Sequence, residues 1–278
     1  MKIIQRIALL LLAGALLAAC GAGQGGQSQG GQTGAGGVAT LRVGASPLPH
    51  AEILKFVRDN LAQREGLDIQ IVEFTDYVQP NLALGDGQID ANFFQHVPYM
   101  EDFGQQRGID MVAVARVHIE PLGLYSRKIS TLADVPQDAV VAIPNDATNA
   151  GRALQLLAAN GLLTLKPEAG TAATPNDITA NPKNLQIKEL EAAQLPRSLD
   201  DTTLSVINGN YALEVGLKPS SDALALEQAT GNPYANVLAV LKSQANDPNI
   251  QKLARLLESP EVRRFIQDTY QGVVIPAA

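Results

Sequence analysis

Two side chains in the stretch Ala139–Leu157, AVVAIPNDATNAGRALQLL, are of types that suit the binding of an anion. Arg152 offers a planar guanidinium that matches the two oxygens of a carboxylate, and Asn149 lies three positions before it. We place Arg152 in the first turn of a helix, where free backbone N–H groups also favour an anion. The helix dipole disfavours a cation at that position by about 0.3–1 kcal/mol. The alternative is that Arg152 forms an ordinary surface ion pair, an interaction that is common and weak.

The elements around these two residues follow from local patterns. Ala139–Ile143 is a short apolar run that is typical of a buried strand, and Pro144 ends it. Gly161 is a stop signal for the helix that carries Arg152. Three residues of the polar turn between strand and helix are suited to cap the helix: Asp146, Thr148 and Asn149. The stretch therefore predicts a strand, a loop and a helix, with the anion site where the helix begins.

Aromatic residues gather in a second region. Half of the 12 lie between positions 74 and 103, namely Phe74, Tyr77, Phe93, Phe94, Tyr99 and Phe103. The simplest explanation is a hydrophobic core, which we favour for Phe74, Phe103 and one of the two adjacent phenylalanines. However, Gln95 and His96 at the end of a predicted strand make this segment too polar for a core alone. It favours an aromatic pocket with a few polar groups, suited to a small ligand whose side chain is apolar or contains sulfur.

The rest of the chain alternates between strand and helix patterns. Apolar runs and period-two alternation predict strands at 41–45, 67–74, 89–94, 110–117, 139–143, 186–191 and 203–207. Apolar residues at helical spacing predict helices over 53–61, 77–84 and 97–107, and Ser259 is expected to cap a last helix. Such alternation predicts an α/β protein with mainly parallel sheets, whose ligands bind at the carboxyl ends of the strands.

The beginning of the chain has the features of an export signal. Lys2 and Arg6 form a short basic region, and the apolar run that follows is too short to span a bilayer comfortably. Leu17–Cys20, LAAC, matches the lipobox of bacterial lipoproteins, which predicts that residues 1–20 are a lipoprotein signal peptide with Cys20 as the acylated residue. The alternative is a plain secretory signal with an incidental cysteine. Since Cys20 is the only cysteine, we expect an exported body without disulfides.

A flexible tether and a folded body are predicted to follow the signal. Residues 21–37 contain nine glycines and no charge, so they cannot bury enough apolar surface to fold and would span roughly 20–25 Å. The body then runs from about residue 38 to residue 278. Without Lys2 and Arg6 the chain keeps 19 of its 21 basic residues against 28 acidic ones, a net charge of -9. This charge argues against nucleic acid as a partner.

Several function classes lack their sequence signals. The chain has no Gly-x-Ser-x-Gly and no His-Glu-x-x-His motif, which argues against an enzyme of the hydrolase class. His50, His96 and His118 show no metal-ligand spacing, so neither a metal nor another cofactor is expected. A structural or adhesive lipoprotein would not need Arg152 beside paired asparagines. These considerations favour a receptor for a small ligand.

Five longer motifs, in a specific order, add a resemblance to a known family. They are DANFFQHVPY (Asp90–Tyr99), EPLGLYS (Glu120–Ser126), AIPNDATNAGRALQLL (Ala142–Leu157), NPKNLQIKELEAAQLPRSLDD (Asn181–Asp201) and VINGNYA (Val206–Ala212). On these motifs the chain resembles the methionine-binding lipoproteins of ABC importers, the NlpA/MetQ family of substrate-binding proteins. The resemblance extends over essentially the whole predicted body, from its first strand to its tail.

The resemblance implies a fold and a role. The fold would be the two-lobed periplasmic-binding-protein fold, type II-like, with the ligand buried in the cleft between lobes that close over it. The first lobe would comprise residues 38–119 and 228–278, and the second lobe residues 120–227. The protein would be a monomeric receptor, not an enzyme, anchored by lipid at the extracytoplasmic face of the cell membrane. It would deliver methionine to an ABC permease with its cytoplasmic ATPase.

The resemblance also implies the site. Methionine's carboxylate would meet Arg152, with Asn149 and Asn208 close to its polar end. Four residues of the first lobe would line the side-chain pocket: Tyr77, Phe94, His96 and Tyr99. One departure is Phe93, where members of the family often have a smaller residue. Because adjacent strand residues point to opposite faces, we expect Phe94 to reach the ligand and Phe93 to belong to the core.

The identity of the ligand within the receptor class stays open at this point. Another small amino acid, D-methionine or a short peptide are the alternatives to methionine, because loops that the sequence does not define set the depth of the pocket.

Overall fold

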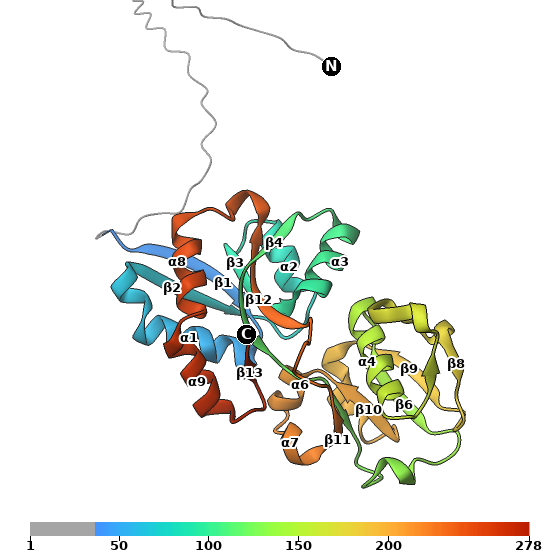
Figure 1. Cartoon of the computed structure of the whole chain (residues 1–278). Coiled ribbons are helices and arrows are strands. Elements are labelled where there is room, and N and C mark those ends of the chain that lie inside the picture. The colour runs from blue at the N-terminus through green and yellow to red at the C-terminus, as the bar shows by residue number, and fades with distance from the viewer. Residues whose placement is uncertain (1–36, 278) are drawn as a thin grey trace, which may run out of the picture. The chain divides into compact units, whose positions relative to one another are not determined.

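The computed structural model describes residues 37–277, which contain two α/β lobes, each built around its own sheet (Figure 1). The predicted signal peptide, the predicted lipidation residue Cys20 and all but the last residue of the predicted tether lie outside the described residues. Across residues 37–277, no helix has both the length and the apolar character that crossing a membrane requires.

Six strands form the sheet of the first lobe, in the spatial order β13-β4-β12-β3-β1-β2. Their bounds are β1 Ala39–Ala45, β2 Leu67–Glu73, β3 Ala91–His96, β4 Met111–Ile119, β12 Ala235–Leu241 and β13 Ile275–Pro276. Strand β1 pairs in parallel with β2 and β3, whereas β12 pairs antiparallel with β3 and β4. The chain thus returns late in the sequence to complete a sheet that it started at its beginning.

Helices cover both faces of this sheet. Their bounds are α1 Glu52–Asn60, α2 Gln79–Gly85, α3 Val97–Arg107, α8 Pro248–Leu257 and α9 Pro260–Tyr270, with short turns η1 Pro47–Ala51, η2 Ala62–Glu65 and η7 Lys242–Gln244. Helices α1, α8 and α9 pack on one face, and α2 and α3 pack on the other (Figure 1). The helices on both sides keep water away from the strands.

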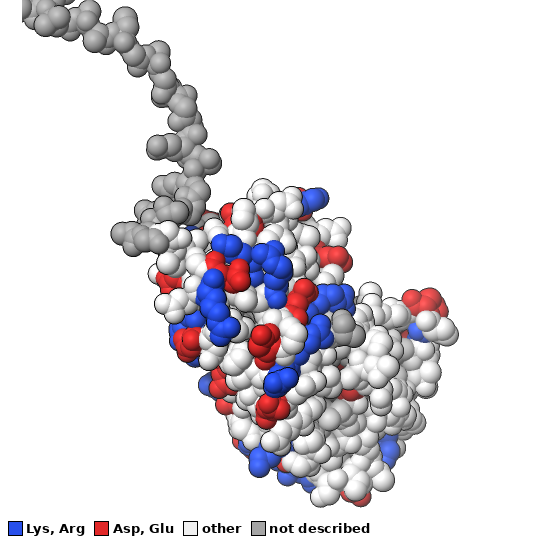
Figure 2. All heavy atoms as spheres, turned by 60° about the vertical axis from the view of Figure 1, so that its left-hand side comes forward, with Lys and Arg blue, Asp and Glu red and all other residues white. Residues whose placement is uncertain are grey.

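The surface of the first lobe carries charges of both signs. Basic and acidic side chains are interspersed on the face drawn in Figure 2. Lys55 of α1, for example, pairs with Glu73 of β2 at 2.8 Å, with both side chains more than 40% exposed. Exposed pairs of this kind contribute about 0–1 kcal/mol, so the charges serve solubility more than stability.

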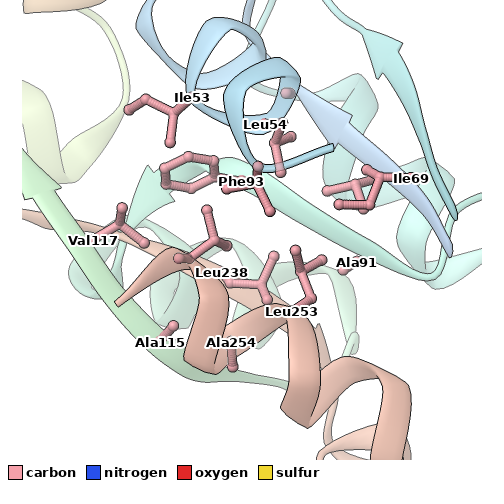
Figure 3. Close-up of a cluster of buried hydrophobic side chains, with 14 of the residues drawn as sticks. Ile53, Leu54, Ile69, Ala91, Phe93, Ala115, Val117, Leu238, Leu253 and Ala254 are labelled. Atoms are coloured by element: carbon pink, nitrogen blue, oxygen red, sulfur yellow. The ribbon is translucent and has the colours of Figure 1, made fainter. Parts of the chain in front are cut away.

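The main core of the first lobe lies between the sheet and helices α1, α8 and α9 (Figure 3). Ile53 and Leu54 of α1 and Leu253 of α8 are fully buried there. Phe93 of β3 is buried among them, as predicted from the alternation of strand residues. Each such side chain contributes roughly 1.5–3 kcal/mol through removal from water, so this core holds β3 firmly in place.

The second lobe contains a five-stranded sheet in the order β11-β5-β10-β6-β9. The strands are β5 Gly123–Tyr125, β6 Val140–Pro144, β9 Gln186–Leu190, β10 Leu204–Ile207 and β11 Ala223–Leu226; β7 Thr164–Leu165 and β8 Ile178–Ala180 form a separate pair. The helices are α4 Ala147–Ala159, α5 Leu195–Ser198, α6 Gly209–Glu214 and α7 Pro219–Asp222, with short turns η3 Leu132–Asp134, η4 Pro167–Ala172, η5 Pro175–Asp177 and η6 Ala192–Gln194. Helix α4 packs against β6 and supplies much of the lobe's own core.

The sheets are mixed, so the prediction of mainly parallel sheets was wrong. Strands joined through helical crossovers are parallel, as in β1–β2, β1–β3, β6–β9 and β6–β10. The strands that adjoin the two connections between the lobes, β4 and β5 in one and β11 and β12 in the other, make antiparallel pairs. Alternation of strand and helix detects only the crossovers, because an antiparallel strand needs none.

Local signals placed several element ends well. Ser259 caps α9 by accepting the N–H of Val262, as predicted. Of the three candidate caps before α4, Asp146 fills the position and accepts the N–H of Asn149 at 2.9 Å. Helix α2 begins later than predicted, which leaves Tyr77 in the preceding loop.

Candidate ligand-binding site

A small cavity lies between the two lobes. All seven residues predicted to bind ligand line it: Tyr77, Phe94, His96, Tyr99, Asn149, Arg152 and Asn208. Five further residues line it that sequence reasoning did not select: Gln95, Glu120, Gly209, Asn210 and Asn236. Its lining combines aromatic rings with convergent polar groups, as the lining of a small-molecule site does.

The polar lining residues stand where strands end. His96 is the last residue of β3, Glu120 directly follows β4, and Asn208 directly follows β10. The turn after β6 leads into α4, which carries Asn149 and Arg152. The site therefore lies at the carboxyl ends of strands, as predicted for an open α/β sheet.

The first lobe provides an aromatic wall. The ring centroids of Tyr77 lie 5.9 Å from Phe94 and 5.8 Å from Tyr99, and the Tyr99 hydroxyl donates to the backbone carbonyl of Tyr77 at 2.9 Å. Phe94 and Tyr99 are buried with Phe103 behind them. Neighbouring Phe93 points to the opposite face of β3, into the core. The wall thus offers a packed apolar surface to a ligand side chain.

His96 connects this wall to the second lobe. Its Nδ1 accepts the N–H of Tyr99 at 3.2 Å and caps α3, so the ring proton is on Nε2. Nε2 donates to the Asn149 Oδ1 at 3.2 Å. Burial, followed by the positive charge of Arg152, lowers the pKa of His96 to about 3. His96 is therefore neutral at physiological pH, and it acts through its two hydrogen bonds and not as a proton donor or acceptor in a reaction.

Arg152 lies deeper in the helix and in the protein than predicted. With Asp146 as the cap, Arg152 is the sixth residue of α4 and therefore in the second turn, not the first. Its side chain is 4% exposed, so it is not a surface ion pair either. The guanidinium donates from Nε to Glu227 at 2.8 Å and lies 4.4 Å from the ring centroid of Tyr234. Arg152 is consequently separate from the free backbone N–H groups at the start of the helix.

The Arg152 guanidinium ties both connections between the lobes to α4. Nη2 donates to a Glu227 carboxylate oxygen and to the backbone carbonyl of Glu120 at 2.9 Å. Glu120 lies in the connection from β4 to β5, and Glu227 in the connection from β11 to β12. Within residues 37–277, Nη1 makes no hydrogen bond, so one edge of the fork stays available beside the cavity.

Three asparagines supply further polar groups of the site. Asn149 uses its whole amide, since Nδ2 donates to Asp146 at 3.0 Å and Oδ1 accepts from His96 and from the Asn208 Nδ2. Asn208 Oδ1 and Asn210 Nδ2 are buried and have no hydrogen-bond partner in the described part of the chain. A buried polar atom without a partner costs about 1–3 kcal/mol, so these two atoms are candidates to meet a ligand.

Two bonds join the lobes across the mouth of the site. The Tyr77 hydroxyl donates to Asn210 Oδ1 at 2.5 Å, and the Tyr211 hydroxyl donates to the backbone carbonyl of Thr75 at 3.2 Å. Tyr77 and Thr75 belong to the first lobe, and Asn210 and Tyr211 belong to α6 of the second. These contacts hold the cavity shut on the side of α6.

Glu120 is the most informative residue that sequence reasoning missed. Its carboxylate is buried and lies next to two buried histidines, His50 of η1 and His118 of β4. Burial raises the pKa of Glu120, while His50 and Arg152 oppose that rise. A carboxylate directly after a strand and before Pro121 was the available signal, but nothing local connects it to His50, 70 positions earlier.

The same three groups are a geometric candidate for a metal. The ligand atoms of His50, His118 and Glu120 all lie within 4.8 Å of one another. Both Nδ1 atoms lack a partner among the described residues, whereas the second nitrogen of a metal-ligating histidine normally donates to an oxygen. A hydrogen bond from His118 to Glu120 and one from His50 to Asn236 already engage both Nε2 atoms of the cluster. The donor set therefore fits a hydrogen-bonded network better than a metal.

Comparison with known proteins links this geometry to a family. The profile of the NlpA lipoprotein family matches residues 41–278. The D-methionine-binding lipoprotein MetQ of Escherichia coli (strain K12) is 39% identical over 234 residues, which cover 84% of this chain and 86% of that protein.

Two solved structures share the fold at similar identity. A nutrient-binding protein from Burkholderia cenocepacia bound to methionine superposes with a TM-score of 0.82 at 44% identity, covering 86% of this chain and all of that one. A periplasmic substrate-binding protein of an ABC transporter from Coxiella burnetii gives a TM-score of 0.82 at 43% identity, with 85% and 100% covered. The two-lobed substrate-binding fold predicted from the sequence is confirmed. By sequence and by structure, this chain belongs to the NlpA lipoprotein family.

Proposed function

We propose that this protein is the substrate-binding component of an ABC importer and that it delivers methionine to the permease. The observation that carries the proposal is one cavity that combines the free edge of a buried guanidinium with an aromatic wall from the opposite lobe. The relatives support it, because one is named for binding D-methionine, one was solved with methionine, and one is a component of an ABC transporter.

The polar end of methionine fits the second-lobe side of the cavity. Its carboxylate would accept from Nη1 of Arg152 and from the unpartnered Nδ2 of Asn210. Its ammonium group would donate to the unpartnered Oδ1 of Asn208 and to the carboxylate of Glu120. Asn149 lines the site but has no atom left over, so we assign it the task of fixing His96 and Asn208. Each charge-assisted bond would contribute about 1.5–3 kcal/mol net.

The thioether end fits the aromatic wall. Tyr77, Phe94 and Tyr99 present ring faces and edges, and sulfur makes favourable contacts with both. Burying the side chain would contribute roughly 1.5–3 kcal/mol more. Because the ligand would touch both lobes, it would favour the closed form that a permease can distinguish. Compaction of the body on addition of methionine, measured by small-angle scattering, tests this step.

The cellular role follows from the same assignment. We infer that Cys20 carries the lipid anchor, that residues 21–37 tether the body to the extracytoplasmic face of the membrane, and that the lobes divide at residues 120 and 227. The partner would be a permease with its cytoplasmic ATPase, the receptor would be a monomer, and it would catalyse no reaction. The net charge of -9 without Lys2 and Arg6 supports a body that does not bind nucleic acid.

Calorimetry with a ligand panel tests the proposal. The protein lacking residues 1–20 is titrated with L-methionine, D-methionine, leucine, norleucine and a methionine-containing dipeptide. We expect methionine to bind more tightly than leucine and norleucine, because only its sulfur gains the aromatic contacts. D-methionine is the first alternative, given the name of the Escherichia coli relative. Tight binding of another ligand with no heat from either methionine isomer would contradict the proposal.

A further inference from the structure

Two buried imidazoles converge on one oxygen of Glu120. His118 Nε2 lies 2.7 Å from Glu120 Oε1, and His50 Nε2 lies 3.2 Å from the same oxygen. The histidine side chains are 0% and 1% exposed, and the glutamate side chain is 6% exposed. Neither histidine lines the cavity, whereas Glu120 does. The histidines therefore stand behind a group that faces the ligand.

The partners of the two rings define their proton positions. His50 Nε2 also lies 3.1 Å from the side-chain oxygen of Asn236, so both of its neighbours are oxygen acceptors. Burial lowers the pKa of His50 to about 4 and that of His118 to about 3, which leaves both rings neutral at physiological pH. A neutral ring that faces oxygens through Nε2 carries its single proton there. His118 then donates to Glu120 Oε1, whereas His50 donates to Asn236 Oδ1 and keeps its Nε2 3.2 Å from Glu120 Oε1.

Phe93 holds the two rings in this arrangement. Its ring lies edge-on to His50 at 4.8 Å and to His118 at 5.3 Å between centroids, and the two imidazoles are 4.9 Å apart. Phe93 is 0% exposed and belongs to the main core of the first lobe. The rigid core therefore fixes the direction from which both imidazole rings face the carboxylate.

On the other side, Gly209 leaves room for the carboxylate. A Cβ atom at this position would lie 2.7 Å from Glu120 Cβ and 3.2 Å from Glu120 Oε2. Gly209 lines the cavity beside Asn208 and Asn210. The Oε2 side of the carboxylate thus faces the polar part of the cavity, while Oε1 accepts from His118 and lies beside His50.

We propose that His50 and His118 are positioning residues that hold the Glu120 carboxylate, through Oε1, so that its other oxygen receives the ligand's α-amino group. The site would thereby select ligands with a free amino group over those that have only a carboxylate and a side chain. This inference rests on the proposed function, since it needs a ligand of the amino-acid class. It adds two residues that lie outside the cavity to the determinants of ligand choice.

Several charged or titratable groups act on Glu120 from the surrounding elements. They are His50 of η1, His118 of β4, Tyr77 before α2, Arg152 of α4, Glu214 of α6 and Tyr270 of α9. Burial raises the pKa of Glu120, and His50 and Arg152 oppose that rise. His118 donates a hydrogen bond to Oε1, which also favours the charged carboxylate. Removing a donor should therefore move the titration of Glu120 to higher pH.

The experiment compares methionine with 4-(methylthio)butanoate, which is methionine without its amino group. Affinities are measured by calorimetry for the wild type, His118→Leu, His50→Leu and the donor-retaining His118→Gln, between about pH 5 and pH 8. We expect His118→Leu to lower methionine affinity at neutral pH by about tenfold or more, corresponding to ~1.4 kcal/mol or more. The affinity for the analogue should stay unchanged. His118→Gln should restore most of the preference for methionine, because its amide can donate in place of Nε2.

The pH dependence of the affinity distinguishes this role from a merely structural one, which would not change it. In the wild type, methionine affinity should fall as the pH drops through the pKa of Glu120, because a protonated carboxyl no longer attracts an ammonium group. In His118→Leu the fall should occur at higher pH, and the analogue should show neither effect. If His118→Leu lost affinity for both ligands equally at every pH, or lost affinity for neither, the inference would be overturned.

A measurement on the wild type covers the case in which a variant fails to fold. Nitrogen-15 NMR of labelled histidines should show the proton of both rings on Nε2, and a proton on Nδ1 of either ring would overturn the inference. If the wild type binds methionine and the analogue with equal affinity, the inference fails while the receptor assignment stands. If it binds neither compound, the proposed function itself fails.

Discussion

The two walls of the cavity differ in how the chain builds them. The aromatic wall comes from Tyr77, Phe94, His96 and Tyr99, which lie within 23 positions around β3 and α3. The polar wall comes from residues far apart in sequence that meet only through the crossing of the two lobes. Arg152, for example, reaches Glu227 across 75 positions.

The difference concerns direction as much as distance in sequence. Apolar contacts are non-directional, so a local cluster of rings on a rigid strand suffices to make a pocket for a side chain. Hydrogen bonds and ion pairs need defined geometry, and each polar group here is oriented by another, as Asn149 is by Asp146. We therefore expect substitutions in the polar wall to change both stability and ligand choice, and substitutions in the aromatic wall to change stability and affinity.

The largest effect is expected for Arg152→Met. The change leaves the carboxylate of Glu227, 16% exposed, without its partner, and breaking a buried pair in this way costs about 3–5 kcal/mol. Methionine affinity should also fall by at least roughly tenfold, since a charge-assisted bond of about 1.5–3 kcal/mol is lost. Chemical denaturation and calorimetry measure the two effects.

The double variant Arg152→Met, Glu227→Met is the matched control. It removes both charges, so unfolding free energy should recover while methionine binding stays weak. Normal methionine affinity in either variant would show that Arg152 does not hold the carboxylate.

Next in size is the effect of Phe94→Ala on the aromatic wall. Truncation of a buried phenylalanine costs about 3 kcal/mol of stability, at the lower end of the usual range because Phe94 borders a cavity. Phe103→Ala is the control, because Phe103 packs behind the wall but does not line the cavity. Both variants should unfold more easily, but only Phe94→Ala should bind methionine more weakly. Equal affinities in the two variants would place Phe94 outside the ligand site.

The same contrast explains what could be predicted from the sequence. The capped helix α4, the strand β3 and the helix α3 follow from short apolar runs, caps and turn residues, and the structure has them close to the predicted positions. The structure also brings the seven predicted site residues to one cavity, although their contact with a ligand stays a prediction. Local pattern therefore indicated the aromatic region and the helix that carries Asn149 and Arg152, although Arg152 lies in the second turn and not in the first. The full set of pocket residues, Asn208 included, came from the family resemblance.

The contacts that the sequence did not reveal form where the chain returns from the second lobe to the first. Strand β12, which lies between β3 and β4, is added from residues more than 100 positions later, and no periodicity indicates that partner. The partner of Arg152 and the pairing of His50 with Glu120 depend on the same crossing of the lobes. These contacts are set by topology, and Glu120 was missed for this reason.

A smaller effect is expected for Gly209→Ala, which sharpens the comparison within the polar wall. The new Cβ would approach Glu120 Cβ to 2.7 Å, so the glutamate or the start of α6 must shift. Overpacking of this kind costs about 1–3 kcal/mol, and displacement of Glu120 should weaken methionine binding. Thermal unfolding and calorimetry measure the two costs. Ala212→Gly in α6 is the control, because it tests a general effect on the helix. Gly216→Ala is unsuitable, because the φ of 77° at Gly216 disfavours a side chain. A similar affinity loss in Ala212→Gly would mean that α6, not Glu120, is responsible.

The smallest effect is expected for Tyr77→Phe, which removes one bond between the walls and keeps the ring. The Tyr77 hydroxyl donates to Asn210 Oδ1 of the opposite lobe, so its loss acts on the closed form. A hydrogen bond of this type contributes about 0.5–1.5 kcal/mol, which predicts a loss of methionine affinity of up to about tenfold with little change in unfolding. Tyr211→Phe removes the other hydroxyl that bridges the lobes, to Thr75, and should behave alike. If both variants instead lost stability and kept full affinity for methionine, the two tyrosines would belong to the packing of their own lobes, and closure over the ligand would have to depend on the polar wall alone.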